Sequence, residues 1–411
     1  MPESPAGVAF RHSNFRYYLT LRVLTTTASE MQAVAVAWQV YALTHRPLDL
    51  GLVGLAQFLP GILLFLVAGQ TADRFPRQRI LQACCAGFAV CSLLLLGLTW
   101  HGVSSIWPIY GVLLANGTVR AFNGPAGQAF LPLLVPEEFF PKAVAWNSSI
   151  VQAAMIGGPV AGGLLYGFAG SPALVYGCAA IEYLAALVAL AGIRVRTAGG
   201  LRPAASYSMA LEGLRYIRRN KMILGAISLD LFAVLLGGAV ALLPVYAREI
   251  FKIGASGLGL LRSAPGVGAV IMALVVARWP LRRHAGAIML WCVCGFGVFT
   301  VVFGLSRNVA LSLAALALIG ACDMVSVIVR HTLVQLSTPD EMRGRVSAVN
   351  VVFIGASNEV GQFESGITAQ WFGTVPAVVL GGLGTIAIVA LWAWRFPALR
   401  RVDALVRQGR A

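Results

Sequence analysis

The feature that most constrains this chain is a series of apolar runs, each long enough to cross a lipid bilayer as a helix. A membrane-spanning helix needs about 20 apolar residues. Hydrophobic residues make up 58% of the chain and charged residues only 11%, whereas a soluble domain has about 25% charged residues. We therefore predict an all-α membrane protein with twelve transmembrane helices, at about residues 15–43, 49–72, 78–100, 105–131, 142–168, 171–193, 222–247, 256–277, 284–305, 308–336, 345–372 and 375–396.

One long polar interruption divides these runs into two sets of six. It covers residues 194–221 and holds seven Lys and Arg residues. We predict an N-terminal six-helix bundle at 1–193, a cytoplasmic linker at 194–221, a C-terminal six-helix bundle at 222–397 and a cytoplasmic tail at 398–411. Within the linker, Tyr207 to Asn220 is expected to form an amphipathic helix on the membrane surface.

The net charge of +15 predicts an orientation and argues against nucleic acid as a partner. The segments on the side of both termini hold 23 Lys and Arg residues, and the opposite segments hold about five. Basic loops stay on the cytoplasmic side of a membrane. We therefore expect a multi-pass protein of the bacterial inner membrane with both termini in the cytoplasm.

An internal repeat supports two related halves. A shift of 203 residues places Pro136-Glu137-Glu138 on Pro339-Asp340-Glu341. The same shift places Asn147 on Asn350, Gly158 on Gly361 and Gly163 on Gly366. Parallel repeats of six helices belong to a transporter architecture in which the substrate site lies between the halves near the membrane midplane.

The loop between the second and third runs reads Gly69-Gln-Thr-Ala-Asp73-Arg74-Phe-Pro-Arg77. Gly69 suits close helix packing, and Asp73 can accept hydrogen bonds from Arg74 or Arg77. This stretch resembles the signature loop of the major facilitator superfamily, which implies a cytoplasmic gate and the two-bundle major facilitator fold. The alternative is a positive-inside anchor, which explains the arginines but not the spacing of Gly69 and Asp73.

Two further stretches resemble motifs of drug–proton antiporters in that superfamily. They are Arg120-Ala-Phe-Asn123-Gly124 in the fourth run and Gly158-Pro159-Val-Ala-Gly162-Gly163 in the fifth. The second resembles a helix-bend motif associated with export, although plain helix packing also explains its glycines. Residues 330–369, together with Asn14-Phe15-Arg16, resemble the exporter family that includes the enterobactin exporter and macrolide efflux proteins.

Polar and ionisable residues inside the runs are the candidates for transport chemistry, because a charge at mid-bilayer costs roughly 2.5–3.5 kcal/mol. We hypothesise that one or two buried acids carry the coupling proton, with Glu30 and Asp323 as first choices. Arg120 would respond to that protonation or bind an anionic substrate group. The alternative is a static ion pair such as Arg120 with Glu30. Glu364, Arg330 and His331 are expected to face headgroups or the cytoplasmic end. The proposed cavity set is Glu30, Arg120, Glu182, Asp230, Asp323, Asn358, Glu359 and Gln362.

No motif of an enzyme or an ATP-driven pump is present in the sequence. It has no GxxxxGK[ST] loop, no HExxH and no GxSxG. The seven cysteines lie inside apolar runs without a CxxC pair, so we expect neither a metal site nor a disulfide.

The function we expect is export of a small amphipathic molecule by a monomeric proton-coupled antiporter that works by alternating access. Its partners would be the small-molecule substrate, protons and the lipid bilayer. The proton gradient would supply the energy, without a cofactor. An uptake symporter and a non-transporting membrane sensor with the same fold remain open.

Overall fold

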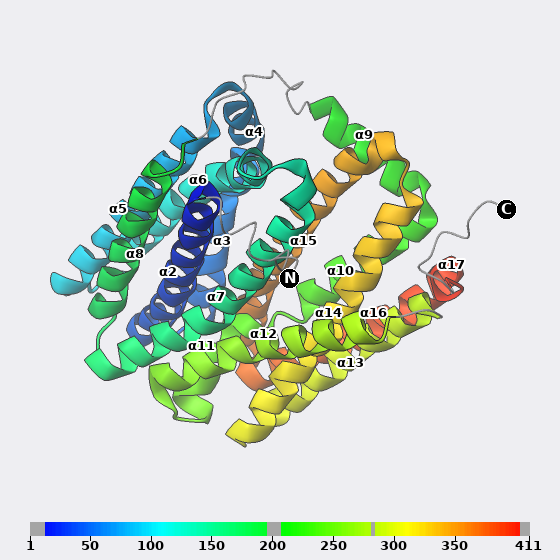
Figure 1. The fold of residues 1–411 in the computed structure, drawn as a ribbon. Coiled ribbons are helices and arrows are strands. Elements are labelled where there is room, and N and C mark those ends of the chain that lie inside the picture. Colours follow the sequence, from blue (N-terminus) through cyan, green and yellow to red (C-terminus); the bar gives the residue numbers. More distant parts are fainter. Residues whose placement is uncertain (1–12, 195–206, 281–283, 403–411) are drawn as a thin grey trace, which may run out of the picture. The chain divides into compact units, whose positions relative to one another are not determined.

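The computed structural model describes residues 13–194, 207–280 and 284–402, and every regular element among them is helical (Figure 1). The N-terminal stretch, part of the predicted linker and most of the predicted tail therefore lie outside the described residues. Ten predicted spans correspond each to one helix: α2 (Ser13–Thr44), α5 (Arg77–Trp100), α6 (Trp107–Phe130), α7 (Phe140–Ala169), α8 (Ala173–Ala191), α12 (Gly254–Arg278), α13 (Ala285–Leu305), α14 (Val309–Ser337), α15 (Asp340–Phe372) and α16 (Thr374–Arg395).

The other two predicted spans are interrupted helices. The run at 49–72 forms α3 (Pro47–Leu63) and α4 (Phe65–Arg74), which are bent by 59°. The run at 222–247 begins as α10 (Lys221–Leu236) and continues through short turns, including α11 (Leu243–Val245), to Ile250. The interruption lies at the glycine pair Gly237-Gly238. A Cβ on Gly238 would lie 2.7 Å from the carbonyl oxygen of Gly361 on α15. The twelve-helix fold class is thus confirmed.

Among the described residues, eight helices are long and apolar enough to cross a membrane, and the bent α3–α4 pair makes a ninth. The remaining long helices, α2, α6 and α15, carry polar side chains in their interiors. Gln32 and Gln39 are buried on α2, Asn116 on α6 and Asn350 on α15. These three helices therefore contribute buried polar groups to the interior of the two units.

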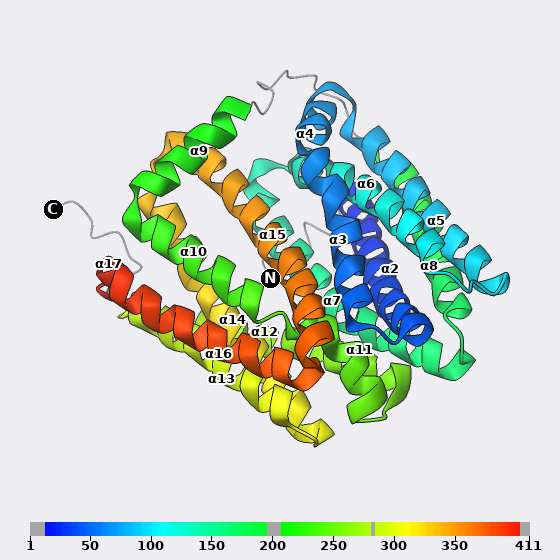
Figure 2. The same ribbon diagram turned by 180° about the vertical axis from the view of Figure 1, so that it is seen from behind.

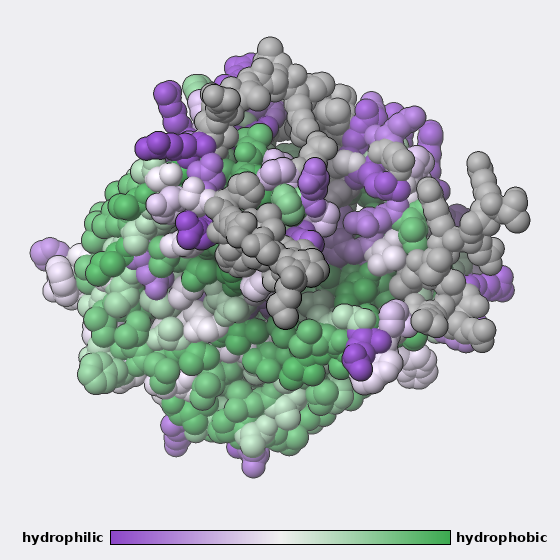
Figure 3. Space-filling model, in the orientation of Figure 1, coloured by the Kyte–Doolittle hydropathy of each residue, from purple (hydrophilic) through white to green (hydrophobic). Residues whose placement is uncertain are grey.

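Large apolar side chains cover the outside of the helices. Phe168 is 89% exposed and Trp291 is 76% exposed. The face drawn in Figure 3 is broadly hydrophobic over the helices, and hydrophilic residues gather mainly toward one edge. Soluble monomers rarely expose apolar patches above a few hundred Å², so lipid must contact this surface.

The chain divides into two compact units. Unit 1 contains Met1–His45, Ala56–Ala205 and Ile253–Leu260, and unit 2 contains Arg46–Leu55, Ser206–Lys252 and Leu261–Ala411. In unit 1, α2 packs on α7 and α8, and α5 packs on α6 and α8. In unit 2, α13 packs on α14 and α16, and α10 packs on α15 and α16 (Figure 2).

Buried polar side chains connect α2 to its neighbours in unit 1. Ser92 on α5 donates to Gln32 at 2.6 Å. Tyr176 on α8 donates to Gln39 at 2.6 Å, and Gln39 donates to Thr99 at 3.3 Å. Buried hydrogen bonds of this kind fix the register of helices that apolar contacts alone would leave free to slide.

The repeat found in the sequence makes matching contacts in the two units. In unit 1, a Cβ on Gly158 would lie 2.6 Å from Glu30 Cβ on α2, and one on Gly163 would lie 3.0 Å from Gly259 Cα. In unit 2, a Cβ on Gly361 would lie 2.9 Å from the Leu235 carbonyl of α10, and one on Gly366 would lie 3.0 Å from Gly51 Cα. Repeat-related glycines therefore bring α7 and α15 against corresponding helices.

The helix predicted for Tyr207–Asn220 is present as α9 (Tyr207–Arg219). Its apolar side, however, contacts protein rather than the membrane surface. Ile217 is 1% exposed and belongs to a core cluster with Ile223 of α10 and with Val346 and Val349 of α15. The apolar side of α9 therefore packs within the protein, and the position of the helix on the membrane surface stays a prediction.

Candidate functional site

The clearest concentration of charge lies inside unit 2, where Arg330 of α14 and Asp230 of α10 form an ion pair. Arg330 is 2% exposed and Asp230 is 6% exposed. Arg330 Nη1 donates to Asp230 Oδ2, whereas Arg330 Nε is buried without a hydrogen-bond partner among the described residues. A buried ion pair is costly to form and costly to break, so its position inside a membrane helix bundle marks a functional candidate.

Asp323 lies two turns before Arg330 on the same helix, so the two side chains share a face of α14. The charges of Asp230 and Arg330 both act on Asp323, which is half-buried. Among the described residues, no hydrogen bond or ion pair forms to Asp323. We name Asp230, Asp323 and Arg330 the acid–arginine cluster.

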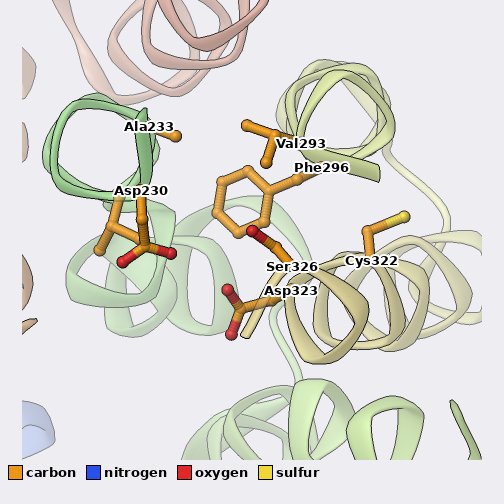
Figure 4. Close-up of a pocket in the computed structure, with 8 residues that line it drawn as sticks. Asp230, Ala233, Val293, Phe296, Cys322, Asp323 and Ser326 are labelled. Atoms are coloured by element: carbon orange, nitrogen blue, oxygen red, sulfur yellow. The ribbon is translucent and has the colours of Figure 1, made fainter. Parts of the chain in front are cut away.

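A small pocket adjoins this cluster, with a cavity volume of about 10 Å³. Figure 4 shows Asp230 from α10 and Asp323 from α14 extending toward the same space, with Ser326 and Phe296 beside them. Drug-sized ligands occupy pockets of roughly 300–1,000 Å³. The pocket therefore suits a proton or a water molecule better than an amphipathic substrate.

The sequence led us to expect that Arg330 faces headgroups or the cytoplasmic end, whereas its side chain is 2% exposed and paired with Asp230, so it does not face headgroups. It lies seven residues before Ser337, the last residue of α14, which is about 10 Å along the helix axis. Depth alone therefore allowed an interfacial position. The available signal was spacing, because Asp323 and Arg330 are seven residues apart and α10 supplies a third charge at Asp230.

The other first-choice acid, Glu30, lies in unit 1 at the closest approach of α2 and α7. Gly158 faces Glu30, and a Cβ on Gly162 would lie 2.7 Å from Met31 Cα. The opposite side of this motif meets the start of α12, where Ser256 Oγ donates to the carbonyl of Gly163 at 3.3 Å. Gly158, Pro159, Gly162 and Gly163 thus pack α7 between α2 and residues 253–260.

The polar candidates on α15 form a second small group in unit 2. Gln362 Nε2 donates to Glu359 Oε2 at 3.3 Å. A Cβ on Gly54 of α3 would lie 3.1 Å from Glu359 Oε2, so this glycine leaves room for the pair. Asn358 is exposed, and its amide donates to the Ile354 carbonyl of its own helix at 3.0 Å.

Arg120 and Asp323 occupy equivalent positions in the repeat. Each residue lies three positions after a glycine of its own helix. At that glycine, the helix contacts the second helix of the same six-helix half, α3 for Gly117 and α12 for Gly320. A Cβ on Gly117 would lie 3.0 Å from Gln57 Cα, and one on Gly320 would lie 2.7 Å from Pro265 Cα. Arg120 is exposed on α6. Equivalent positions therefore carry opposite charges.

Glu182 lies apart from the groups described above. It is half-buried on α8, and its Oε2 has no hydrogen-bond partner among the described residues. The structure therefore brings together Asp230 with Asp323, and Glu359 with Gln362. It does not assemble all eight candidates into one group within either unit.

The gate motif spans the end of α4 and the start of α5. Arg77 Nη1 donates to the carbonyl of Ala129 at 3.0 Å, near the end of α6. The next residue, Gln78, donates to the carbonyls of Leu190 and Ile193 at 2.9 and 2.8 Å. Helix C-termini leave carbonyls unpaired, so these two side chains fasten the ends of α6 and α8 to α5.

The remaining gate residues lie on α4. Asp73 and Arg74 are exposed in its last turn. A Cβ on Gly69 would meet no described atom within 4 Å. The close helix packing expected at Gly69 is therefore not seen in this structure.

Comparison with known families gives a match over residues 5–409, to the family described as transmembrane secretion effector, within the major facilitator superfamily. The chain is also 26% identical over 381 residues to the enterobactin exporter EntS of Shigella dysenteriae serotype 1. That alignment covers 91% of this chain and 86% of the relative.

Solved structures share the fold. A bacterial homologue of the human lysosomal transporter Spinster, in an inward-facing and unoccupied conformation, superposes with a TM-score of 0.72 and 12% identity. The superposition covers 94% of this chain and 96% of that structure. A transporter of the POT family in complex with a thioalcohol-conjugated peptide gives a TM-score of 0.74 at 10% identity, over 94% and 96% of the two chains. At such identities, these matches establish the fold alone.

Proposed function

Because this chain belongs to the transmembrane secretion effector family of the major facilitator superfamily, we propose that it exports a small amphipathic molecule across the bacterial inner membrane in exchange for protons. The chain is a multi-pass membrane transporter, and the exporters it matches support outward transport. The finer parts of the proposal are the proton coupling, the antiport and the alternating access of a monomer with cytoplasmic termini. No catalytic step and no cofactor are part of it.

The observation that carries the proton coupling is the charge balance of the acid–arginine cluster. Arg330 compensates the negative charge of Asp230 on α10. Asp323 is a second acid, on the same face of α14 as Arg330, and it has no ion pair of its own among the described residues. With both acids ionised, the cluster holds one uncompensated negative charge. Such a charge away from water is costly, and proton binding to Asp323 removes it.

Alternating access supplies the cycle. When Asp323 is open to the acidic side of the membrane it binds a proton, and when it is open to the other side it releases the proton. A proton on Asp323 also neutralises one of the two carboxylates that attract Arg330. Protonation therefore strengthens the ion pair between Asp230 and Arg330. The cluster thereby couples the charge state of α14 to its packing against α10.

The substrate class follows from the chemistry of the spans and from the relatives. Apolar walls with a few polar groups bind amphipathic molecules, and the relatives are named enterobactin exporters. Enterobactin is therefore the first compound to test, followed by a panel of amphipathic drugs. Arg120, exposed on α6, is the proposed contact for an anionic substrate group.

The test is transport by the full chain in proteoliposomes with an imposed pH gradient. We expect the pH gradient to drive accumulation of the substrate by the native protein. In Asp323→Asn, the rate of this gradient-driven accumulation should fall at least tenfold. Substrate–substrate exchange without a gradient should persist in that variant. The matched control is Glu364→Gln, which changes another acid of unit 2 whose Oε1 accepts from Thr368 at 2.7 Å.

Each alternative has its own outcome. Substrate that moves in the same direction as the protons would identify an uptake symporter. Binding without movement of any compound would indicate a sensor. Full gradient-driven export in Asp323→Asn would remove the acid–arginine cluster from the coupling mechanism while leaving export intact.

A further inference from the structure

A compact set of exposed cations lies on and beside α9. Arg215, Arg218 and Arg219 are exposed, as is Lys221 at the start of α10. Positions three and four residues apart share one side of a helix, so Arg215, Arg218 and Arg219 form a basic side. The only acid of α9 is Glu212, which pairs with Arg345 of α15.

The opposite side of α9 is fixed to three other helices. A Cβ on Gly213 would lie 2.7 Å from the Arg345 carbonyl of α15, which shows how closely the two backbones approach. Tyr216 Oη donates to the Ser337 carbonyl at the end of α14 at 3.0 Å. Ile217 packs against Ile223 of α10. The basic side, whose arginines are exposed, consequently points away from the protein core. Figure 2 shows α9 beside α10 and α15.

The depth of these cations relative to the membrane follows from the short connection between α9 and α10. One residue, Asn220, separates the two helices, and its Oδ1 accepts from the backbone N–H of Met222 and of Ile223. The span that starts at Lys221 is among the most apolar in the chain. Arg218, Arg219 and Lys221 therefore lie within about one helical turn of the hydrocarbon boundary, which is where headgroup phosphates are found.

We infer that the basic side of α9, with Lys221, binds the headgroups of anionic phospholipids and that this binding holds α9 against α14 and α15. Clusters of Lys and Arg beside a membrane span attract anionic headgroups. Phosphate oxygens pair well with guanidinium groups. The bound lipid neutralises four neighbouring cations. Without the lipid, the mutual repulsion of these cations weakens the packing of α9 against α14 and α15.

The inference is tested by thermal unfolding of the full chain in nanodiscs of phosphatidylglycerol or of phosphatidylcholine. Unfolding is followed with a thiol-reactive dye, since all seven cysteines are buried or half-buried. We expect phosphatidylglycerol to raise the melting temperature of the native protein by roughly 2–5 °C. Arg215→Gln/Arg218→Gln/Arg219→Gln should abolish that rise, whereas Arg215→Lys/Arg218→Lys/Arg219→Lys should retain it.

A matched control removes three other exposed cations of unit 2, with Arg395→Gln/Arg400→Gln/Arg401→Gln. This variant should keep the lipid-dependent rise. Glycerol phosphate added to phosphatidylcholine nanodiscs separates lipid headgroups from free phosphate, and it should produce no rise. The inference is overturned if the α9 variant keeps the full rise, if the control loses it equally, or if free glycerol phosphate reproduces it.

Discussion

Arg330 on α14 and Asp230 on α10, one hundred residues apart in the chain, form a buried ion pair between two membrane helices. This pair ties α10 to α14 at the pocket lined by Asp323. Desolvation offsets much of the attraction within a buried ion pair, so we expect this pair to contribute little net stability.

The first prediction concerns the two partners of this pair. Arg330→Met should destabilise the protein by roughly 3–5 kcal/mol, since it leaves Asp230 buried without compensation. The double variant Asp230→Leu/Arg330→Met should recover most of that loss. Thermal unfolding of the single and double variants measures both effects.

The control for this cycle is Arg345→Met, which breaks the exposed pair with Glu212. An exposed ion pair contributes about 1 kcal/mol or less, so this change should be nearly neutral. If Arg330→Met were equally mild, the buried pair would not have the structural role assigned to it.

The second prediction concerns the contact between α7 and α2. Gly158→Ala should destabilise the protein by roughly 1–3 kcal/mol, because its methyl group would lie 2.6 Å from Glu30 Cβ. Gly157→Ala is the neighbouring control, since a Cβ there meets no described atom within 4 Å. The control should be neutral or stabilising by up to about 1 kcal/mol. Equal losses in the two variants would contradict the close contact.

The third prediction compares the repeat-related glycines Gly163 and Gly366. A Cβ on Gly163 would lie 2.6 Å from the carbonyl oxygen of Ala255, whereas the nearest atom to a Cβ on Gly366 would be Gly51 Cα at 3.0 Å. We expect alanine to lower stability at both positions by roughly 1–3 kcal/mol, with the larger loss at Gly163. A larger loss at Gly366 than at Gly163, or no loss at either position, would contradict these contacts.

The fourth prediction concerns the polar connection between α8 and α2. Tyr176→Phe removes the donor to Gln39 and should lower stability by about 1–3 kcal/mol, because Gln39 Oε1 is left buried without that partner. Tyr17→Phe changes a tyrosine that is 44% exposed and serves as the control. Matching unfolding curves for the two variants would show that the Tyr176 hydroxyl does not stabilise the fold.

The fold was predictable because its main determinant is the length of apolar runs, which is visible residue by residue. The span predicted at 78–100, for example, is α5, Arg77–Trp100. The break of α10 was not predictable in the same way, since Gly237 and Gly238 also occur in a run that reads as continuous. Their effect depends on contacts of Gly237 with Phe296 of α13 and of Gly238 with α15, which the sequence alone does not place.

The candidate site was only partly predictable, because burial of a charge depends on how its helix is rotated. Asp230 and Asp323 could be found as charges within apolar runs. The ion pair of Arg330 with Asp230 was not predicted, because the distance of Arg330 from the end of α14 left its partner undetermined. Gly69 was assigned a packing role from its residue type, yet its neighbourhood in the structure is open.

The equivalence of Arg120 and Asp323 has a consequence for how such a chain can arise. A symmetric assembly of two identical six-helix subunits would carry either two arginines or two aspartates at these places. Neither arrangement gives one cationic and one acidic residue to a single molecule. Because the two halves are separate copies within one polypeptide, each can accept its own substitution, and a single molecule carries Arg120 in one half and Asp323 in the other.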